Sequence, residues 1–130
     1  MEIFTGLDVG GSSLKFGLVS SEGELLEKKK VPVKQLRAAG DLADGVVGAV
    51  ADWLKDHPQV QHVGIGVPGM ISQDRRALVE LANMPELNGL PLLDLLEKRN
   101  PNIVFHLEND ANAAALGEYY FSGQKMPENF

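Results

Sequence analysis

Residues 3–19 read IFTGLDVGGSSLKFGLV, and this stretch decides the fold that the sequence predicts. Ile3 to Val9 is mostly apolar and rich in β-formers, which is typical of a buried strand. A glycine-rich turn signal follows at residues 10–13, and the alternation from Leu14 to Val19 predicts a second strand. The chain is therefore expected to open with a β-hairpin.

The next elements extend this hairpin. Leu25 to Val33 predicts a third strand at a sheet edge, because it carries three lysines and a proline. The apolar period then becomes helical, and Asp41 is placed to cap a helix that ends before Pro58. Gly45 and Gly48 weaken this helix, so we expect them to serve a close approach of the helix to the sheet.

Strands and helices alternate in the rest of the chain. Strands are predicted at 63–67 and 103–107, and helices at 92–98 and from Asn109 or Asp110 to about residue 121. Residues 66–91 are expected to form a long loop with a little structure around 77–81. The order predicts an α/β fold: a mixed five-stranded sheet, made of an antiparallel three-strand meander plus parallel strands, with helices on both faces.

Length and composition exclude several classes of protein. The 130 residues suit one domain or one lobe of a larger protein, and the net charge of −6 disfavours nucleic acid or an anionic membrane as a partner. The absence of cysteine excludes a disulfide scaffold and is compatible with a cytoplasmic location. No apolar run approaches the ~20 residues of a membrane span, and the first residues lack the features of a signal peptide.

The first candidate site is LDVGGSSLK, residues 7–15. Glycines let main-chain N–H groups approach an anion, so Gly10 to Ser13 can cradle phosphate, with Lys15 nearby. Asp8 can hold Mg²⁺ through water. No helix opens after the glycines, so this is not a Walker A loop. An ordinary hairpin turn with a solvated carboxylate is an equal alternative.

The second candidate is GIGVPG, residues 64–69, which has the spacing of a dinucleotide fingerprint. That fingerprint needs a helix directly after the turn, and none is predicted here, so we reject it. A strand that ends in a tight Pro68-Gly69 turn beside a small ligand fits better. A plain turn fits equally well.

The third candidate is ENDANAAALGE, residues 108–118, where polar residues join a strand to a helix. In open α/β sheets, ligands bind outside the carboxyl ends of strands. Asp110 can accept a proton there, and Asn109 can both donate to and accept from a polyol. Helix capping is the alternative, but it explains one polar residue better than four. Arg75 and Arg76 are read as part of a solvated loop.

Taken together, these motifs resemble the ROK family of bacterial sugar kinases and repressors. NMPELNGLPL, residues 83–92, is similar to a further motif of that family, and the resemblance spans nearly all of the chain. It implies a ribonuclease-H-like, actin-like ATPase fold of two lobes, with residues 1–130 as the N-terminal lobe and the C-terminal lobe absent from this chain. It also implies Asp110 as the general base, Asn109, Asn83 and Gly69 as sugar ligands, and the segment from Asp8 to Ser13 facing Mg²⁺ and ATP.

The resemblance leads us to expect ATP-dependent phosphorylation of a hexose, with glucose and its 6-hydroxyl as the default, by a homodimer of the full-length parent. Glu86-Leu87 replaces the tryptophan usual in the family, so the identity of the sugar stays open. A structural zinc site would belong to the missing lobe. The isolated lobe is expected to be inactive, since half of the cleft would be missing.

Two other functions stay open at this stage. A sugar-sensing regulator of the same family would carry a DNA-binding domain, for which the first strand at Ile3 leaves no room; Asp8 and Asp110 also favour a kinase. A truncated domain that serves only in oligomer contacts would leave the polar strand ends unexplained.

Overall fold

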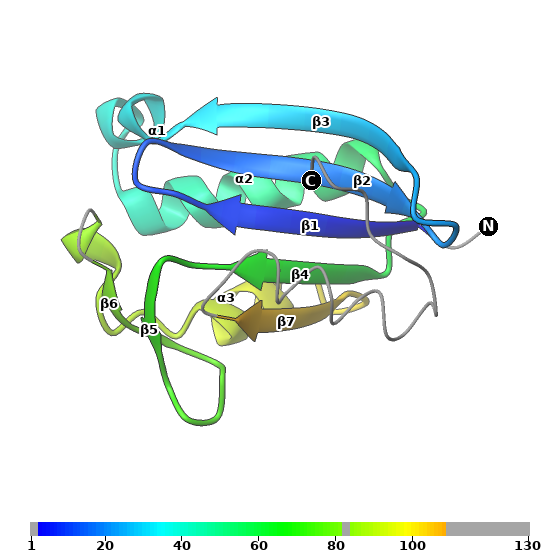
Figure 1. Ribbon diagram of the computed structural model, residues 1–130. Helices are drawn as coiled ribbons and strands as arrows, with labels where there is room; N and C mark the ends of the chain where they lie inside the picture. The colour runs from blue at the N-terminus through cyan, green and yellow to red at the C-terminus, as the bar shows by residue number, and fades with distance from the viewer. Residues whose placement is uncertain (1–2, 82–83, 109–130) are drawn as a thin grey trace.

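The computed structural model describes residues 3–81 and 84–108. Its main feature is a five-stranded mixed sheet in the order β3-β2-β1-β4-β7 (Figure 1). The first three strands form an antiparallel meander, and β4 and β7 run parallel to β1. The predicted sheet is confirmed. The strands are β1 (Ile3–Val9), β2 (Ser13–Ser20), β3 (Leu25–Pro32), β4 (His62–Gly66) and β7 (Val104–Glu108).

One face of the sheet packs against α2 (Leu42–Asp56), the helix that the sequence predicts. Asp41 caps it as expected, because its side chain accepts a hydrogen bond from the Asp44 N–H at 3.0 Å. Trp53 of α2 is buried against the sheet, where its ring stacks on Phe16 and its indole N–H donates to Thr5 Oγ1 at 2.9 Å. Burial of one such large side chain contributes ~1.5–3 kcal/mol, so this interface stabilises the fold strongly.

The helix α3 (Leu92–Arg99) joins the same core through Leu92, Leu93 and Leu96. A further helix, α1 (Val33–Ala39), differs from the prediction, which extends a strand to Val33 and assigns no element to the residues that follow. The chain turns into α1 directly after Pro32, and Gly40, with φ of 146°, ends it. Seven residues are too few to show a clear helical period.

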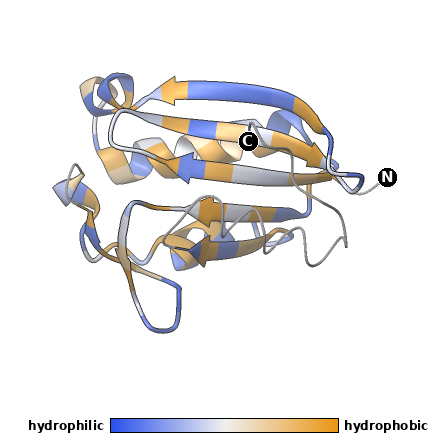
Figure 2. Cartoon of the chain, in the orientation of Figure 1, coloured by the Kyte–Doolittle hydropathy of each residue, from blue (hydrophilic) through white to orange (hydrophobic). Residues whose placement is uncertain are grey.

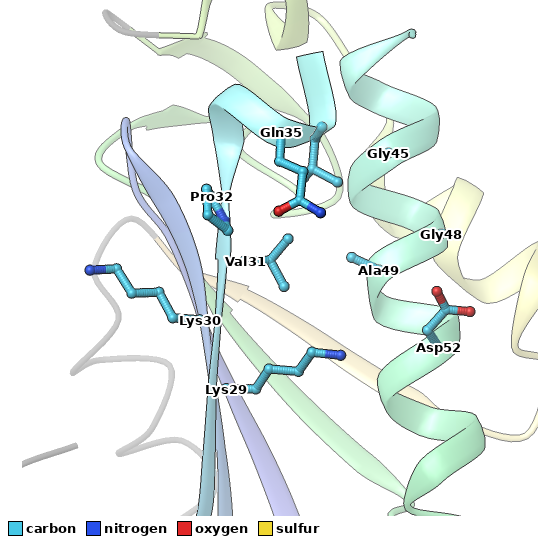
Figure 3. A pocket seen from close by; sticks show the side chains of 10 residues that line it. Lys29, Lys30, Val31, Pro32, Gln35, Gly45, Gly48, Ala49 and Asp52 are labelled. Atoms are coloured by element: carbon cyan, nitrogen blue, oxygen red, sulfur yellow. The ribbon is translucent and has the colours of Figure 1, made fainter. Parts of the chain in front are cut away.

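The two glycines of α2 have different surroundings. A Cβ on Gly45 would lie 3.2 Å from Leu36 Cβ, so Gly45 allows a close approach to α1 and not, as expected, to the sheet. A Cβ on Gly48 would meet nothing within 4 Å, so the expectation of close packing there is wrong. Gly48 instead lines a cavity of about 390 Å³ between β3, α1 and α2, into which Lys29 extends from β3 (Figure 3).

The strand β3 lies at a sheet edge, as its lysines and proline predict, and its hydrophilic surface is evident in Figure 2. The turn before it lies at the end of β2, where Ser20 pairs with Ile3 at the start of β1. Ser20 Oγ accepts from the N–H groups of Glu22 and Glu24, both at 3.2 Å. Gly23 adopts φ of 81°, a conformation that suits glycine.

The sheet register places Gly17, Gly6 and Gly64 side by side across β2, β1 and β4, on the face opposite to α2. Without side chains, this row leaves room for close packing. The helix predicted after β7 lies outside the described residues.

The long loop expected after β4 contains a hairpin, formed by β5 (Gly69–Ile71) and β6 (Leu78–Leu81). The strand β6 falls where a little structure was predicted, whereas β5 is missed because three residues show no alternation. A short 3₁₀ helix, η1 (Pro85–Leu87), follows. Among the described residues, no helix has the length and apolar character needed to span a membrane.

Candidate active site

The parallel strands β1, β4 and β7 end at one edge of the sheet, which we call the rim. The register aligns Asp8 of β1 with Gly66 of β4, and Gly66 with Glu108 of β7. Neighbouring strands lie ~4.8 Å apart, and β4 lies between β1 and β7. The Asp8 and Glu108 backbones are therefore separated by about 10 Å in total. Gly66 leaves the space between them free of a side chain. The rim thus brings Asp8 to the strand that leads into residues 109 and 110.

The turn between β1 and β2 stands at this rim. The Gly10 N–H donates to the Ser13 carbonyl at 3.0 Å, and the Val33 N–H donates to the Ser12 carbonyl at 2.9 Å. A Cβ on Gly10 would lie 3.1 Å from the Ser13 oxygen, so the turn requires a small residue at this position. The Gly10 N–H already donates to Ser13 within the turn. It is therefore not available to bind phosphate, the role that the sequence suggests for residues 10–13.

The other residues predicted to face the nucleotide lie in or beside this turn. Asp8 and Lys15 are partners across β1 and β2, so their side chains share a sheet face. Lys15 and Ser12 are exposed, Gly11 is half-buried and Ser13 is buried. The structure therefore brings Asp8, the segment 10–13 and Lys15 together.

The segment 64–69 also meets the rim. The strand β4 ends at Gly66, the Val67 N–H donates to the Glu108 carbonyl at 3.0 Å, and β5 begins at Gly69. No helix follows this turn, which agrees with our rejection of a dinucleotide fingerprint. A Cβ on Gly69 would lie 2.2 Å from the Glu80 carbonyl oxygen, so only glycine lets β5 approach β6 this closely.

Charged side chains hold the β5–β6 hairpin, and here the sequence interpretation needs correction. Arg75 and Arg76 are not simply solvated. Arg75 Nη1 donates to Glu108 Oε1, and Arg76 Nη2 donates to Asp94 Oδ1 of α3 at 2.7 Å and to Glu97 Oε1. Their carboxylate partners lie 18 to 33 residues further along the chain. No local motif indicates pairs between residues so far apart in the chain, so the sequence pattern does not predict them.

The central sugar-site predictions fall on Asn83, Asn109 and Asp110, which lie outside the described residues. Their described neighbours are Leu81 and Met84, both buried, and Glu108 at the rim. The Leu81 N–H donates to Asn88 Oδ1 at 2.8 Å, so Asn88 has a structural role in holding this segment.

One titratable side chain near the rim has a shifted pKa. His106 lies two residues before Glu108 on β7, with its ring stacked against that of His62 at 6.4 Å between centroids. Burial lowers the pKa of His106, and the neighbouring His62 lowers it further, while Glu108 acts in the opposite direction. His106 therefore favours its neutral form.

The fit of Mg²⁺ depends on Asp8. Within residues 3–81 and 84–108, no three His, Cys, Asp or Glu side chains come together as a metal-binding group. Mg²⁺ is commonly held by one or two carboxylates together with water and substrate phosphates, so a single Asp8 beside the glycine turn is a suitable anchor.

The sheet order and the surrounding helices define the class of protein: the actin-like ATPase fold, as in ROK sugar kinases. A crystal structure from Cytophaga hutchinsonii matches with a TM-score of 0.82 and 38% identity, over 98% of this chain and 40% of that one. A ROK family glucokinase from Streptomyces griseus, in complex with glucose and AMPPNP, matches with a TM-score of 0.70 and 33% identity, over 94% of this chain and 38% of that one.

The family model described as "ROK family" matches residues 4–130, and the chain therefore belongs to the ROK family. It is 39% identical to the glucokinase of Thermotoga maritima over 119 residues, which cover 89% of this chain and 36% of that protein. It is 34% identical to the glucokinase of Streptomyces coelicolor over 129 residues, which cover 99% of this chain and 39% of that protein. The chain thus spans less than half the length of these relatives.

Proposed function

We propose that the protein to which this chain belongs transfers the γ-phosphoryl group of ATP to a hexose, with the 6-hydroxyl of glucose as the first acceptor to test. The observation that carries this proposal is the rim, where Asp8, the turn 10–13 and the end of β7 share one sheet edge. The glucokinase relatives and the kinase bound to glucose and AMPPNP support it.

The rim suits a reaction that depends on positioning. Phosphoryl transfer needs in-line geometry and neutralisation of phosphate charge, and little covalent work from the protein. Asp8 would hold Mg²⁺ through water, and the bound ion would neutralise phosphate charge. The main chain of residues 11–13, with Lys15, would orient the phosphates, while Gly10 would maintain the shape of the turn. Gly69, Asn83 and Asn109 would bind the sugar hydroxyls.

In this proposal Asp110 is the general base. A sugar hydroxyl hardly ionises at neutral pH, so its proton must leave as the bond to phosphorus forms. An aspartate with an ordinary pKa near ~3.9 is already ionised and able to accept that proton. After transfer the products are ADP and the sugar phosphate, and Asp110 then releases the proton to solvent.

The test is Asp110→Ala in the full-length protein, with ADP release measured against glucose and ATP. General-base catalysis contributes ~10²–10⁴-fold, so kcat should fall by at least that factor while the circular dichroism spectrum is unchanged. Asp56→Asn, in the exposed last turn of α2, is the matched control and should keep normal turnover. A near-normal rate in Asp110→Ala would refute the assignment.

The lobe and the sugar are tested separately. We expect residues 1–130, purified alone, to release no ADP with glucose and ATP, because half of the proposed cleft is contributed by the other lobe. Robust turnover by this fragment would contradict the two-lobe arrangement. A panel of hexoses and N-acetylhexosamines, compared by kcat/KM in the full-length protein, identifies the acceptor.

A sugar-sensing regulator is the second candidate, because the fold alone does not exclude it: a ROK family transcriptional regulator matches with a TM-score of 0.71 at 18% identity. A mobility-shift assay with the DNA upstream of the gene, with and without sugar, separates the two functions. A sugar-dependent shift would favour the regulator, and no shift would favour the kinase. The homodimer, the cytoplasmic location and a zinc site outside residues 1–130 stay predictions from the family.

A further inference from the structure

The β5–β6 hairpin connects the segments that are proposed to bind the sugar. It begins at Gly69, one proposed ligand, and β6 ends at Leu81, two residues before Asn83, another. The loop between the two strands reaches the end of β7, because Arg75 contacts Glu108 there. Glu108 directly precedes Asn109 and Asp110 in the chain. A single hairpin therefore contains Gly69, precedes Asn83 in the chain and contacts the residue before Asn109.

The loop of this hairpin is fixed from within. Ser72 Oγ accepts from the N–H groups of Arg76 and Ala77 at 3.2 and 3.0 Å, and the Ser72 N–H donates to the Ala77 carbonyl at 2.9 Å. Ser72 also donates to Asp74 Oδ1, and Asp74 Oδ1 accepts from the Arg76 N–H. These bonds lower the pKa of Asp74, which therefore keeps its charge.

The loop is also attached to the first turn of α3. The Leu93 N–H donates to the Arg76 carbonyl at 3.0 Å, and the Arg76 guanidinium pairs with Asp94 and Glu97. Arg76 thus joins the hairpin to the helix, and Arg75, the preceding residue in the loop, joins it to the end of β7.

Arg75 has an unusual backbone. Its φ of 58° is the one positive value for a residue other than glycine among residues 3–81 and 84–108. Residues other than glycine rarely adopt this backbone conformation, and it persists where the surrounding structure enforces it. The Arg75 guanidinium contacts Glu108, whose carbonyl also accepts from the Val67 N–H. Glu108 is consequently held at two points: its carbonyl by Val67, directly after β4, and its side chain by Arg75 of the hairpin.

We propose that Arg75 is a positioning residue for sugar binding: its pair with Glu108 fixes the hairpin that begins at Gly69 against the end of β7. This inference rests on the proposed function. Arg75 need not touch the sugar. Its loss is expected to weaken sugar binding and leave the turn at residues 10–13 unaffected.

Arg76 provides a matched control. Arg75→Gln and Arg76→Gln each remove one guanidinium from the same loop, but only the first breaks the contact with β7. A residue that merely stabilises the hairpin would give the same result in both variants. Arg75→Lys keeps the charge of the donor, and Glu108→Gln removes the charge of its partner.

The experiment measures kcat and both KM values in the full-length protein. Arg75→Gln and Glu108→Gln should each raise the KM for sugar about tenfold, with the KM for ATP within about twofold of wild type. The double variant should be no worse than either single variant, because both remove one interaction. Arg75→Lys should restore part of the loss, and Arg76→Gln should leave the KM for sugar within about threefold of wild type.

Unchanged sugar KM in Arg75→Gln, or an equal rise in Arg76→Gln, would overturn the proposal. Amide hydrogen exchange of residues 67–72 gives an activity-independent readout and should become faster in Arg75→Gln and Glu108→Gln. If exchange is unchanged, Arg75 does not fix the hairpin, whatever the kinase assay gives. If the wild-type protein phosphorylates no sugar, the proposed function fails instead, and the exchange result still decides whether the Arg75–Glu108 pair fixes the hairpin.

Discussion

The turn after β1 and the hairpin after β4 stand at the same rim but are held by different interactions. Main-chain hydrogen bonds hold the turn: Gly10 to Ser13, and Val33 to Ser12. The hairpin loop has main-chain bonds of its own and one to α3, and charged side chains add the contacts of Arg75 to β7 and of Arg76 to α3. The first arrangement depends on backbone shape, and the second on replaceable side chains.

This difference fits the two proposed ligands. Phosphate groups are the same in every ATP, and a main-chain turn can serve them with little dependence on side-chain identity. Sugars differ in the placement of their hydroxyls, and a segment positioned by side chains can change its spacing by substitution. The comparison predicts that mutations in the turn and in the hairpin have separable effects, which the following experiments test in order of decreasing size.

The largest effect is expected where the hairpin depends on backbone shape. Gly69→Ala would place a Cβ 2.2 Å from the Glu80 carbonyl oxygen, so β5 and β6 would have to separate. Overpacking of this kind costs ~1–3 kcal/mol, and a contact with backbone is at the upper end of that range. Urea unfolding of the chain measures this loss.

Gly48→Ala is the control for that measurement, since its Cβ would enter open space inside a helix. It should raise the free energy of unfolding by up to ~1 kcal/mol. Equal destabilisation by both variants would show that the Gly69 contact is not the cause.

A smaller effect is expected for Gly10→Ala in the turn. Its Cβ would lie 3.1 Å from the Ser13 oxygen, which a slight shift of the turn relieves, so we expect a loss of about 1 kcal/mol. In the full-length protein this variant should raise the KM for ATP more than the KM for sugar. A larger rise in the KM for sugar than in the KM for ATP would contradict the assignment of the turn to ATP and of the hairpin to sugar.

Salt should affect the two regions differently. The Arg75 side chain is 62% exposed and the Arg76 side chain 39%, so their ion pairs are open to screening. At about 1 M salt the Debye length falls to about 3 Å, and amide exchange in residues 72–77 should become faster while exchange in residues 10–13 stays the same. Uniform behaviour would mean that ion pairs do not hold the hairpin.

The smallest effect is a pH dependence on the β7 side. Because burial and His62 lower the pKa of His106, the unfolded chain binds this proton more readily than the folded chain. The stability is complete above the ordinary histidine pKa of ~6.5 and falls as the pH drops below that value. Thermal unfolding at pH 7 and pH 5 should show this decline, and His106→Gln should reduce it; an unchanged decline would assign it to other groups.

The sequence predicted what local patterns encode. Alternation and apolar runs located the five strands of the sheet, and Asp41 located the start of α2. The helix α1 and the strand β5 were missed because they are too short to show a period. The glycine turn was placed correctly at a strand end beside Asp8.

The contacts that hold the candidate site together were harder to predict. Glu108 and Arg75 lie 33 residues apart, and only the parallel pairing of β4 with β7 brings them together. The close approach at Gly69 is likewise a property of the hairpin, since a Pro-Gly pair alone predicts a turn and not a contact with Glu80. Tertiary pairing decides such contacts, and single-sequence patterns do not report it.

The turn from Ser20 to Glu24 offers a practical opportunity. It lies at the end of the sheet opposite to the rim, and its own hydrogen bonds to Ser20 close it without help from other elements. Exposed turns of this kind are preferred sites for tolerated insertions. A fluorescent reporter or an affinity tag placed there would leave the rim untouched, so the full-length protein can be labelled without altering the proposed site.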